Sequence, residues 1–164
     1  MTSILKVDTI QTTAGAAPTT KDLGFAAGSV IQVLSTSLAS TLGFSSATEA
    51  NVLTLNITPK FNTSKVLIFA NFGLYMNSST TEMRGDFIIR RNTTLIRGSD
   101  SLGVGHYRDG NGSFKSYMQG FNYLDSPATT SAITYKMAFK GHTYAVYGGY
   151  EPDYTNMTLL EIAQ

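Results

Sequence analysis

The chain has 164 residues and a formal net charge of +1, and only 14% of its residues are charged, compared with about 25% in typical soluble domains. This balance gives no attraction to nucleic acid or to an anionic membrane, and no apolar run approaches the roughly 18 residues that span a bilayer. We therefore expect no nucleic-acid partner and no membrane insertion. The absence of cysteine excludes disulfides, thiolate catalysis and zinc–thiolate sites.

Residues 1–28 differ in composition from the rest of the chain. Ile4–Gln11 alternates apolar and polar residues, which predicts a short strand, whereas residues 12–28 are rich in Thr, Ala and Gly, as extended linkers are. A lone strand is marginal by itself and becomes stable by adding to another sheet or to copies of itself. We expect an extended anchor and linker over residues 1–28, with contacts to a larger assembly made by Ile4, Leu5, Val7, Thr9 and Ile10.

The opening residues carry no secretory signal, because they have no apolar stretch followed by a small-residue cleavage site. We therefore expect synthesis in a cytoplasm without export. At the other end, the last predicted strand stops almost at the C-terminus, which favours a terminal strand inside a packed sheet, since an unpaired one would fray.

From residue 29 onward, period-two alternation and β-branched runs predict strands, and no window shows the helical pattern. Nearly every gap between them contains Gly, Pro, Asn, Asp or Ser, the residues that form turns. The pattern predicts an all-β domain over residues 29–164, an antiparallel β-sandwich or jelly roll. The predicted strands are Ser29–Ser35, Asn51–Ile57, Lys65–Tyr75, Met83–Arg91, Thr94–Arg97, Leu102–Arg108, Ser113–Leu124, Ala132–Phe139, His142–Tyr147 and Asn156–Ile162.

Three segments of this domain support more specific predictions. Lys65–Tyr75 is apolar on both faces for part of its length, so it is either the central strand or a strand that a neighbouring subunit also buries. Arg90–Thr94 and Asp109–Gly112 both carry the turn chemistry of β-hairpins.

The residues that usually carry catalysis or bind metals are sparse and scattered. His106 and His142 have no cysteine or carboxylate at metal-ligand spacing, and we expect structural or surface roles for both. The segment from Asp109 resembles a calcium loop only weakly, because Gly120 stands where the bidentate carboxylate belongs. No pair of carboxylates stands out for glycosidic cleavage. We predict no enzyme, no catalytic residue, no cofactor and no metal.

An aromatic cluster near the C-terminus is the main surface candidate. The segment Tyr147–Tyr154 is predicted to be a loop, and its tyrosines beside carboxylates are able to stack on sugars while the carboxylates accept hydroxyl hydrogen bonds. The alternative, which we favour, is that the rings pack between subunits or cover one end of the sandwich. The residues concerned are Tyr144, Tyr147, Tyr150, Asp153 and Tyr154.

The arginines of neighbouring predicted strands have acidic residues nearby in the sequence. We expect solvated or inter-subunit ion pairs from them rather than an anion-binding site. The arginines are Arg84, Arg90, Arg91, Arg97 and Arg108, and the acidic residues are Asp86, Asp100 and Asp109.

Several short stretches bear a family resemblance. Leu5-Lys-Val-Asp-Thr-Ile-Gln11, with the Thr- and Ala-rich residues 12–19 after it, resembles the N-terminal segment of many virion proteins of tailed bacteriophages, marine and cyanobacterial ones especially. Other pieces are similar to the globular head of such fibre-like or decoration proteins: Gly28–Leu34, Ile57–Pro59, Ser64–Ile68, Tyr123–Ser131 and Leu159–Ala163.

The resemblance implies a non-enzymatic virion surface protein, a homotrimer with an outward-facing β head. Its residues 1–28 would attach it to another virion protein, such as a capsid, portal, tail or baseplate component. No shaft separates anchor from head, which favours a short spike, a head fibre or a capsid decoration protein over a long tail fibre. The alternative is a tail-fibre module that binds a glycan receptor on the host surface.

Overall fold

The computed structural model describes residues 24–44, 48–77, 83–97, 104–109, 115–141, 147–150 and 154–164, and these ranges contain strands and no α-helix. The all-β prediction is therefore confirmed. Within the same ranges, no helix is long and apolar enough to cross a membrane. The predicted strand at Ile4–Gln11 lies outside the described residues.

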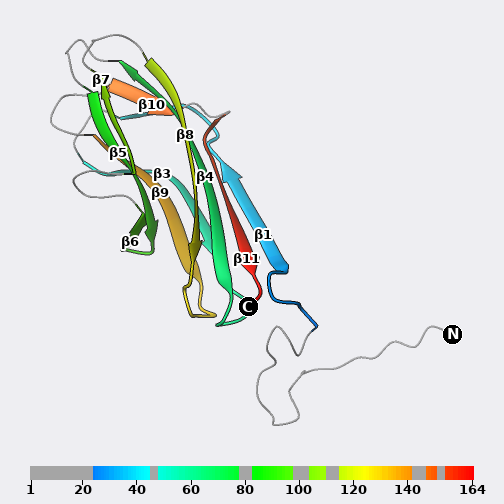
Figure 1. The fold of residues 1–164 in the computed structure, drawn as a ribbon. Helices are drawn as coiled ribbons and strands as arrows, with labels where there is room; N and C mark the ends of the chain where they lie inside the picture. Colours follow the sequence, from blue (N-terminus) through cyan, green and yellow to red (C-terminus); the bar gives the residue numbers. More distant parts are fainter. Residues whose placement is uncertain are drawn as a thin grey trace.

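Nine of the eleven described strands follow predicted segments closely, and those at Met83–Arg91, Thr94–Arg97 and Asn156–Ile162 have the predicted bounds. The strands β2 and β10 were not predicted, and the predicted strand His142–Tyr147 lies outside the described residues except for Tyr147. The described strands are β1 (Val30–Ser37), β2 (Leu42–Phe44), β3 (Ala50–Ile57), β4 (Lys65–Asn77), β5 (Met83–Arg91), β6 (Thr94–Arg97), β7 (Val104–Asp109), β8 (Lys115–Asp125), β9 (Ile133–Gly141), β10 (Tyr147–Tyr150) and β11 (Asn156–Ile162). Figure 1 shows how they lie in space.

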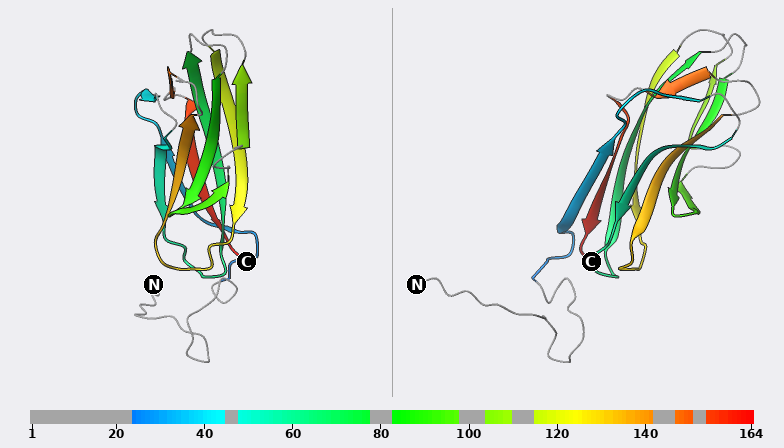
Figure 2. Two further views of the ribbon diagram at one scale, coloured as in Figure 1. Left: turned by 90° about the vertical axis from the view of Figure 1, so that its left-hand side faces the viewer. Right: turned by 180° about the vertical axis from the view of Figure 1, so that it is seen from behind.

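The strands form two antiparallel sheets that pack face to face as a sandwich (Figures 1 and 2). In the first sheet β8 pairs with one edge of β4, while β11 and β10 share the other edge; β1 then pairs with β11, and β2 with β10. In the second sheet the order is β3, β9, β5, and β6 and β7 share the far edge of β5.

This connectivity is that of a jelly roll. The pairs β1/β2, β6/β7 and β10/β11 are each two pieces of one interrupted strand, so each sheet is effectively four strands wide. Numbered along the chain, the eight strands then have the orders 1-8-3-6 and 2-7-4-5. Two four-stranded sheets connected in this way as two Greek keys define the jelly roll.

Two turn predictions have different outcomes. Asn92 has a φ of 54° between β5 and β6, which pair, so the predicted hairpin at Arg90–Thr94 is confirmed. The predicted hairpin at Asp109–Gly112 is wrong, because β7 pairs with β5 in one sheet and β8 pairs with β4 in the other. Turn chemistry marks the position of a chain reversal, but it cannot tell a hairpin from a crossing between sheets.

The core lies between the two sheets. It is made by the inward-facing residues, which alternate with outward-facing residues along each strand. Phe72 of β4 is fully buried, and its ring centroid lies 4.5 Å from that of Phe87 and 5.8 Å from that of Phe121. The predicted central position of β4 is confirmed, because it pairs along both edges. Its alternate residues Val66, Ile68, Ala70 and Phe72 are all fully buried.

The chain enters the sandwich beside the C-terminus (Figure 1). The Gly28 N–H donates to the Ala163 carbonyl at 2.9 Å, and the Ala163 N–H donates to the Ser29 carbonyl at 2.9 Å. Gly28 has a φ of +87°, a conformation that L side chains rarely adopt. Phe25 contacts Phe61 edge to face, with centroids 6.2 Å apart. We call this end, formed by residues 24–29, 58–61 and 162–164, the base.

Candidate functional site

The structure separates the predicted surface residues. The anchor residues Ile4 to Ile10, together with Tyr144 and Asp153, lie outside the described residues. Tyr147 and Tyr150 begin and end β10, which pairs with β4 on one side and β2 on the other. The predicted loop over these positions is therefore wrong for residues 147–150, because paired strands take up both edges of the segment.

Tyr154 is the member of the cluster whose side chain the structure describes, and 54% of it is exposed. Its Cβ lies over Gly73 of β4, where an added Cβ would be only 2.5 Å away. The Gly73 N–H donates to Thr155 Oγ1 at 3.1 Å, and the Thr155 hydroxyl donates back to the Gly73 carbonyl at 3.2 Å. These contacts hold Tyr154 against the outward side of β4.

The outward side of the first sheet carries an apolar row that crosses four strands. Val33 of β1 is paired with Leu160 of β11, Leu160 with Leu67 of β4, and Leu67 with Leu124 of β8. Directly paired residues project from the same face, so the four side chains lie side by side. Because their neighbours along each strand point into the core, all four face away from it.

Further apolar side chains extend this row in both directions. Val30 lies nearer the base, Phe69 is the next outward residue of β4, and Met118 is the β8 partner of Gly73. We call the set Val30, Val33, Leu67, Phe69, Met118, Leu124, Tyr154 and Leu160 the outer apolar face.

Exposed apolar surface is concentrated on this face. Among the described side chains, every large apolar residue classed as exposed belongs to it except Phe25 at the base. Val33 is 57% exposed and Met118 is 67% exposed. Soluble monomers expose single apolar residues freely, but a contiguous patch of this kind is typical of an interaction surface.

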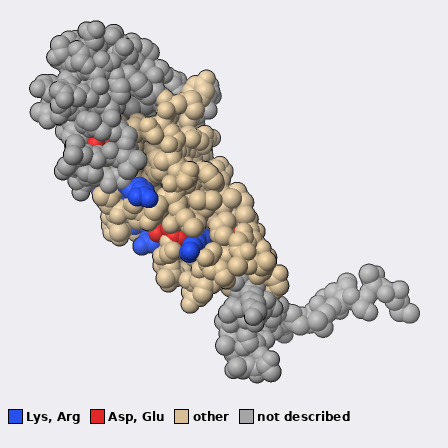
Figure 3. All heavy atoms as spheres, viewed as in Figure 1, with Lys and Arg blue, Asp and Glu red and all other residues tan. Residues whose placement is uncertain are grey.

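The outer apolar face is also almost free of charge. Among the described outward positions of β1, β11, β4 and β8, Lys65 at the base end is the one charged residue, and the others are apolar, glycine or uncharged polar. Figure 3 shows one side of the molecule, on which Lys, Arg, Asp and Glu atoms form a small group in the middle of the described surface and the rest is mostly uncharged. Depletion of charge is what distinguishes the centre of a protein interface from ordinary surface.

The second sheet has a different outward side. Arg90 of β5 pairs with Lys136 of β9, and its guanidinium donates from Nε to Glu49 Oε1 at 2.7 Å. This hydrogen bond holds the pKa of Glu49 below its ordinary value of 4.5. The contrast between the two sheets makes the uncharged face specific to β1, β11, β4 and β8.

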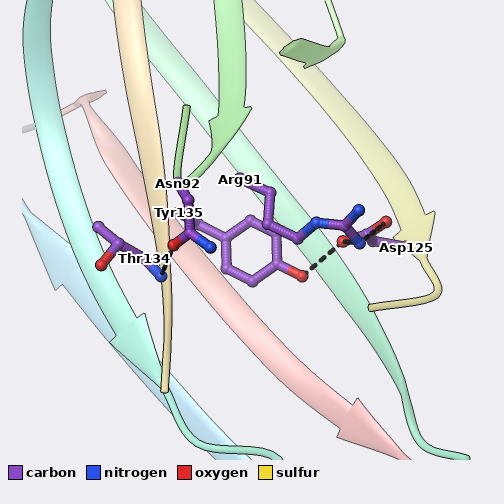
Figure 4. Close-up of polar contacts among 5 residues, drawn as sticks. All are labelled: Arg91, Asn92, Asp125, Thr134 and Tyr135. Carbon is purple, nitrogen blue, oxygen red and sulfur yellow. Dashed lines mark hydrogen bonds and ion pairs between the residues drawn. The ribbon is translucent and has the colours of Figure 1, made fainter. Parts of the chain in front are cut away.

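A buried polar cluster joins the two sheets near the end of β8 (Figure 4). The Tyr135 hydroxyl of β9 donates to Asp125 Oδ2 at 2.6 Å, and Arg91 of β5 donates to both carboxylate oxygens at 2.9 and 3.0 Å. Burial, with the neighbouring Asp125 carboxylate, raises the pKa of Tyr135 well above its ordinary value. The cluster ties β8, which carries Leu124 of the outer face, to both inner strands of the opposite sheet.

A second buried cluster organises the base. Glu161 of β11 is fully buried and accepts hydrogen bonds from Gln32 Nε2 at 2.6 Å and from the Lys60 N–H at 2.7 Å. The Gln32 amide also donates to the Thr58 carbonyl at 2.9 Å. One carboxylate thus connects β1, β11 and residues 58–61, where the chain enters the sandwich.

The remaining predictions concern charged residues and metals. The ion pairs described for the arginines form within one chain, and their partners are Glu49 and Asp125, which the sequence did not indicate. Arg97 instead lies over the Tyr123 ring, 4.3 Å from its centroid. Within the described residues, no group of three or more acidic, histidine or cysteine side chains is placed to hold a metal ion. His106 lies in β7, and His142 is outside the described ranges.

The outer apolar face was only partly visible in the sequence. The two-sided apolar pattern of Lys65–Tyr75 indicated burial by a neighbouring subunit as one alternative, and Leu67 and Phe69 are the outward residues responsible for that pattern. Val33, Leu124 and Leu160 were not identified. Their alignment in one row depends on the order of strands β1, β11, β4 and β8, which no local pattern indicates.

No protein-family model matches the chain, and no curated protein matches it. Among solved structures, this chain is similar to a protein chain in the structure of the Gt strain of infectious bursal disease virus. The identity is 14% and the TM-score is 0.45, over 85% of this chain and 39% of that chain. The structure of the Gx strain gives 11% identity and a TM-score of 0.44 over 99% of this chain and 40% of that one.

A subviral particle of the same virus gives 16% identity and a TM-score of 0.41 over 81% of this chain and 37% of that one. The chain thus spans about two fifths of the length of the proteins to which it is similar.

Proposed function

We propose that this chain is a non-enzymatic structural protein of a bacteriophage virion: a homotrimeric surface spike, head fibre or capsid decoration protein that residues 1–28 attach to another virion protein. The single observation that carries the proposal is the outer apolar face. A solitary jelly roll would leave this uncharged surface in water, whereas a subunit of an assembly buries it.

The path of the chain supports attachment at the base. Residues 24–29 enter beside the C-terminus, where Gly28 and Ser29 are hydrogen-bonded to Ala163. Glu161 strengthens the same end by linking β1 and β11 to residues 58–61. A particle that binds residues 1–23 would therefore be attached to the end of the sandwich that these hydrogen bonds hold together, and the opposite end would point outward.

The experiment compares incorporation of full-length variants into particles. The variant carries Ile4→Asp and Ile10→Asp, which place charges in the proposed anchor, and the matched control carries Thr13→Asp and Thr19→Asp in the linker. Purified particles of the virus that encodes the chain are probed with an antibody to the head. We expect the wild type and the control in the particles and the anchor variant in the unbound fraction. Absence of the wild-type chain from particles would contradict the proposal.

A second candidate function is binding of a glycan on the host surface. The observation that favours it is the exposed ring of Tyr154, because aromatic rings with a free face stack on sugars. Tyr154→Ala should then abolish binding of the wild-type protein to host cells or to a glycan array and leave the oligomeric mass unchanged. Equal binding by the variant and the wild type would remove Tyr154 from this role.

A further inference from the structure

We infer that the outer apolar face is the surface through which copies of this chain pack against one another, with the row Val33, Leu160, Leu67 and Leu124 at the centre of the contact. The inference rests on the proposed function, and it locates on the molecule the self-association that the function requires. The occupant of the face is a second copy of the chain, and not a different protein.

The size of the face is adequate for such a contact. About half of each of Val30, Val33, Phe69, Met118 and Leu124 is exposed, and together these side chains leave roughly 500 Å² of apolar surface in water, near the upper end for monomers. Each copy thus contributes about 500 Å² to contacts with its sister copies, and the three copies of the proposed homotrimer bury about 1,500 Å² in total before their polar rims are counted. Specific interfaces bury about 1,200–2,000 Å² in total.

The chemistry of the face favours a copy of itself over a charged partner. A partner recognised by charge would need complementary charges on this face, and its one described outward charge is Lys65 at the base end. A neutral apolar sheet face matches another neutral apolar sheet face, and sheets pack on one another at about 10 Å with interdigitated side chains. The identical faces of sister copies that meet around a shared threefold axis satisfy this requirement without any second protein.

Residues 1–23 are a poorer occupant. The segment contains Lys6, Asp8, Lys21 and Asp22, and residues 11–20 contain no apolar side chain larger than Ala or Pro. Its large apolar residues are confined to Met1, Ile4–Ile10 and Leu23. One strand of alternating residues would present its apolar side to only part of a face that crosses four strands.

Side-chain hydrogen bonds beneath and beside the outer apolar face hold its strands in fixed positions. Asp125, adjacent to Leu124, is tied to Arg91 and Tyr135 of the other sheet. At the far end, the Asn71 amide donates to Asn156 Oδ1 at 3.0 Å and links β4 to β11. A face held by such contacts loses little conformational freedom on association, which favours a tight contact for a given area.

The test measures the mass of full-length variants by sedimentation at micromolar concentrations. Val33→Glu and Leu124→Glu place a carboxylate at either end of the apolar row, and Thr54→Glu is the matched control, because Thr54 is exposed on β3 in the other sheet. We expect the wild type and Thr54→Glu to be oligomeric and both face variants to be monomeric, with self-association weakened on the order of a hundredfold or more. Circular dichroism of the face variants should match that of the wild type, because both substituted side chains already reach solvent.

Because the chain has no cysteine, one introduced cysteine per chain shows by cross-linking which surfaces of two copies lie close together. Leu67→Cys at the centre of the face should give covalent oligomers with a bis-maleimide that spans about 10 Å, the spacing of packed sheets. Thr54→Cys should remain uncross-linked. Covalent oligomers from the Thr54 variant alone would place the contact on the other sheet and overturn the inference.

The outcomes separate this inference from the proposed function. If the face variants keep the wild-type mass, or if the wild type is monomeric, the face is not a contact between copies, even when the chain is present in particles. If the face variants become monomeric but wild-type chain is absent from particles, the contact between copies stands and the virion role fails.

Discussion

Tyr135 and Asp125 join the two sheets of this jelly roll through one short hydrogen bond of 2.6 Å, in which the phenol donates to the carboxylate. Tyr135 is fully buried and Asp125 is 5% exposed, so water has little access to replace either partner. Arg91 holds the same carboxylate from a third strand. This cluster is a sharp place to test the fold, because each partner that is removed leaves buried polar groups behind.

Tyr135→Phe should reduce the free energy of unfolding by about 1–3 kcal/mol, since the ring remains but Asp125 loses a buried donor. The matched control is Tyr123→Phe, which keeps the ring beneath Arg97 and should change the free energy by less than about 0.5 kcal/mol. Denaturant titration of both variants measures the difference. Equal values for the two would show that the hydrogen bond across the sheets contributes nothing.

The same tyrosine predicts a loss of stability at alkaline pH. Burial raises the pKa of Tyr135 in the folded protein above the ordinary value of 10.0 that it has in the unfolded chain. The unfolded chain therefore loses this proton first, and the contribution of Tyr135, complete below pH 10, declines as the pH rises further. The difference in unfolding free energy between wild type and Tyr135→Phe should shrink by up to about 1.4 kcal/mol per pH unit above that point. A constant difference from pH 8 to 11.5 would contradict this.

Gly73→Ala should destabilise the protein by about 1–3 kcal/mol, because the new Cβ would lie 2.5 Å from Tyr154 Cβ. Tyr154 Cβ is bonded to the backbone, so relief requires the segment at residues 154–155 to move. Gly120→Ala is the control, since its Cβ would meet only the end of the Asn71 side chain, at 2.8 Å from Oδ1. Thermal unfolding at a single concentration compares the two, and a larger loss for Gly120→Ala would refute the argument.

Glu161→Ala should cost about 1–3 kcal/mol, because it removes the acceptor that the Gln32 side chain and the Lys60 N–H share in part-buried hydrogen bonds. Glu49→Ala removes a carboxylate from a partly exposed pair with Arg90, and should cost less than about 1 kcal/mol. Hydrogen exchange adds a local measurement, since the Lys60 amide should lose protection in Glu161→Ala and keep it in Glu49→Ala. Unchanged protection at Lys60 would exclude the proposed role of Glu161 at the base.

Most strands were predictable from the sequence, and their neighbours in the sheets were not. Segments such as Met83–Arg91 and Asn156–Ile162 carry short runs of apolar and β-branched residues, and their predicted bounds equal those of β5 and β11. The short β2 and β10 were not predicted, because three or four residues are too few to show a period. β10 also contains two adjacent glycines, which sequence patterns associate with loops.

The sequence by itself determined that this protein is all-β and where its long strands run, because alternation of apolar and polar residues is a local property of the chain. It left open whether Lys65–Tyr75 is the central strand or a strand that a neighbouring subunit also buries, and the pairing of β4 along both edges decided its central place. Only the tertiary structure decided that Val33, Leu160, Leu67 and Leu124 form one row, and that Tyr135 reaches Asp125. These residues come from strands far apart in the chain, and their alignment depends on strand order and register. Strand order and register are set by packing of the whole sandwich, and no single segment encodes them.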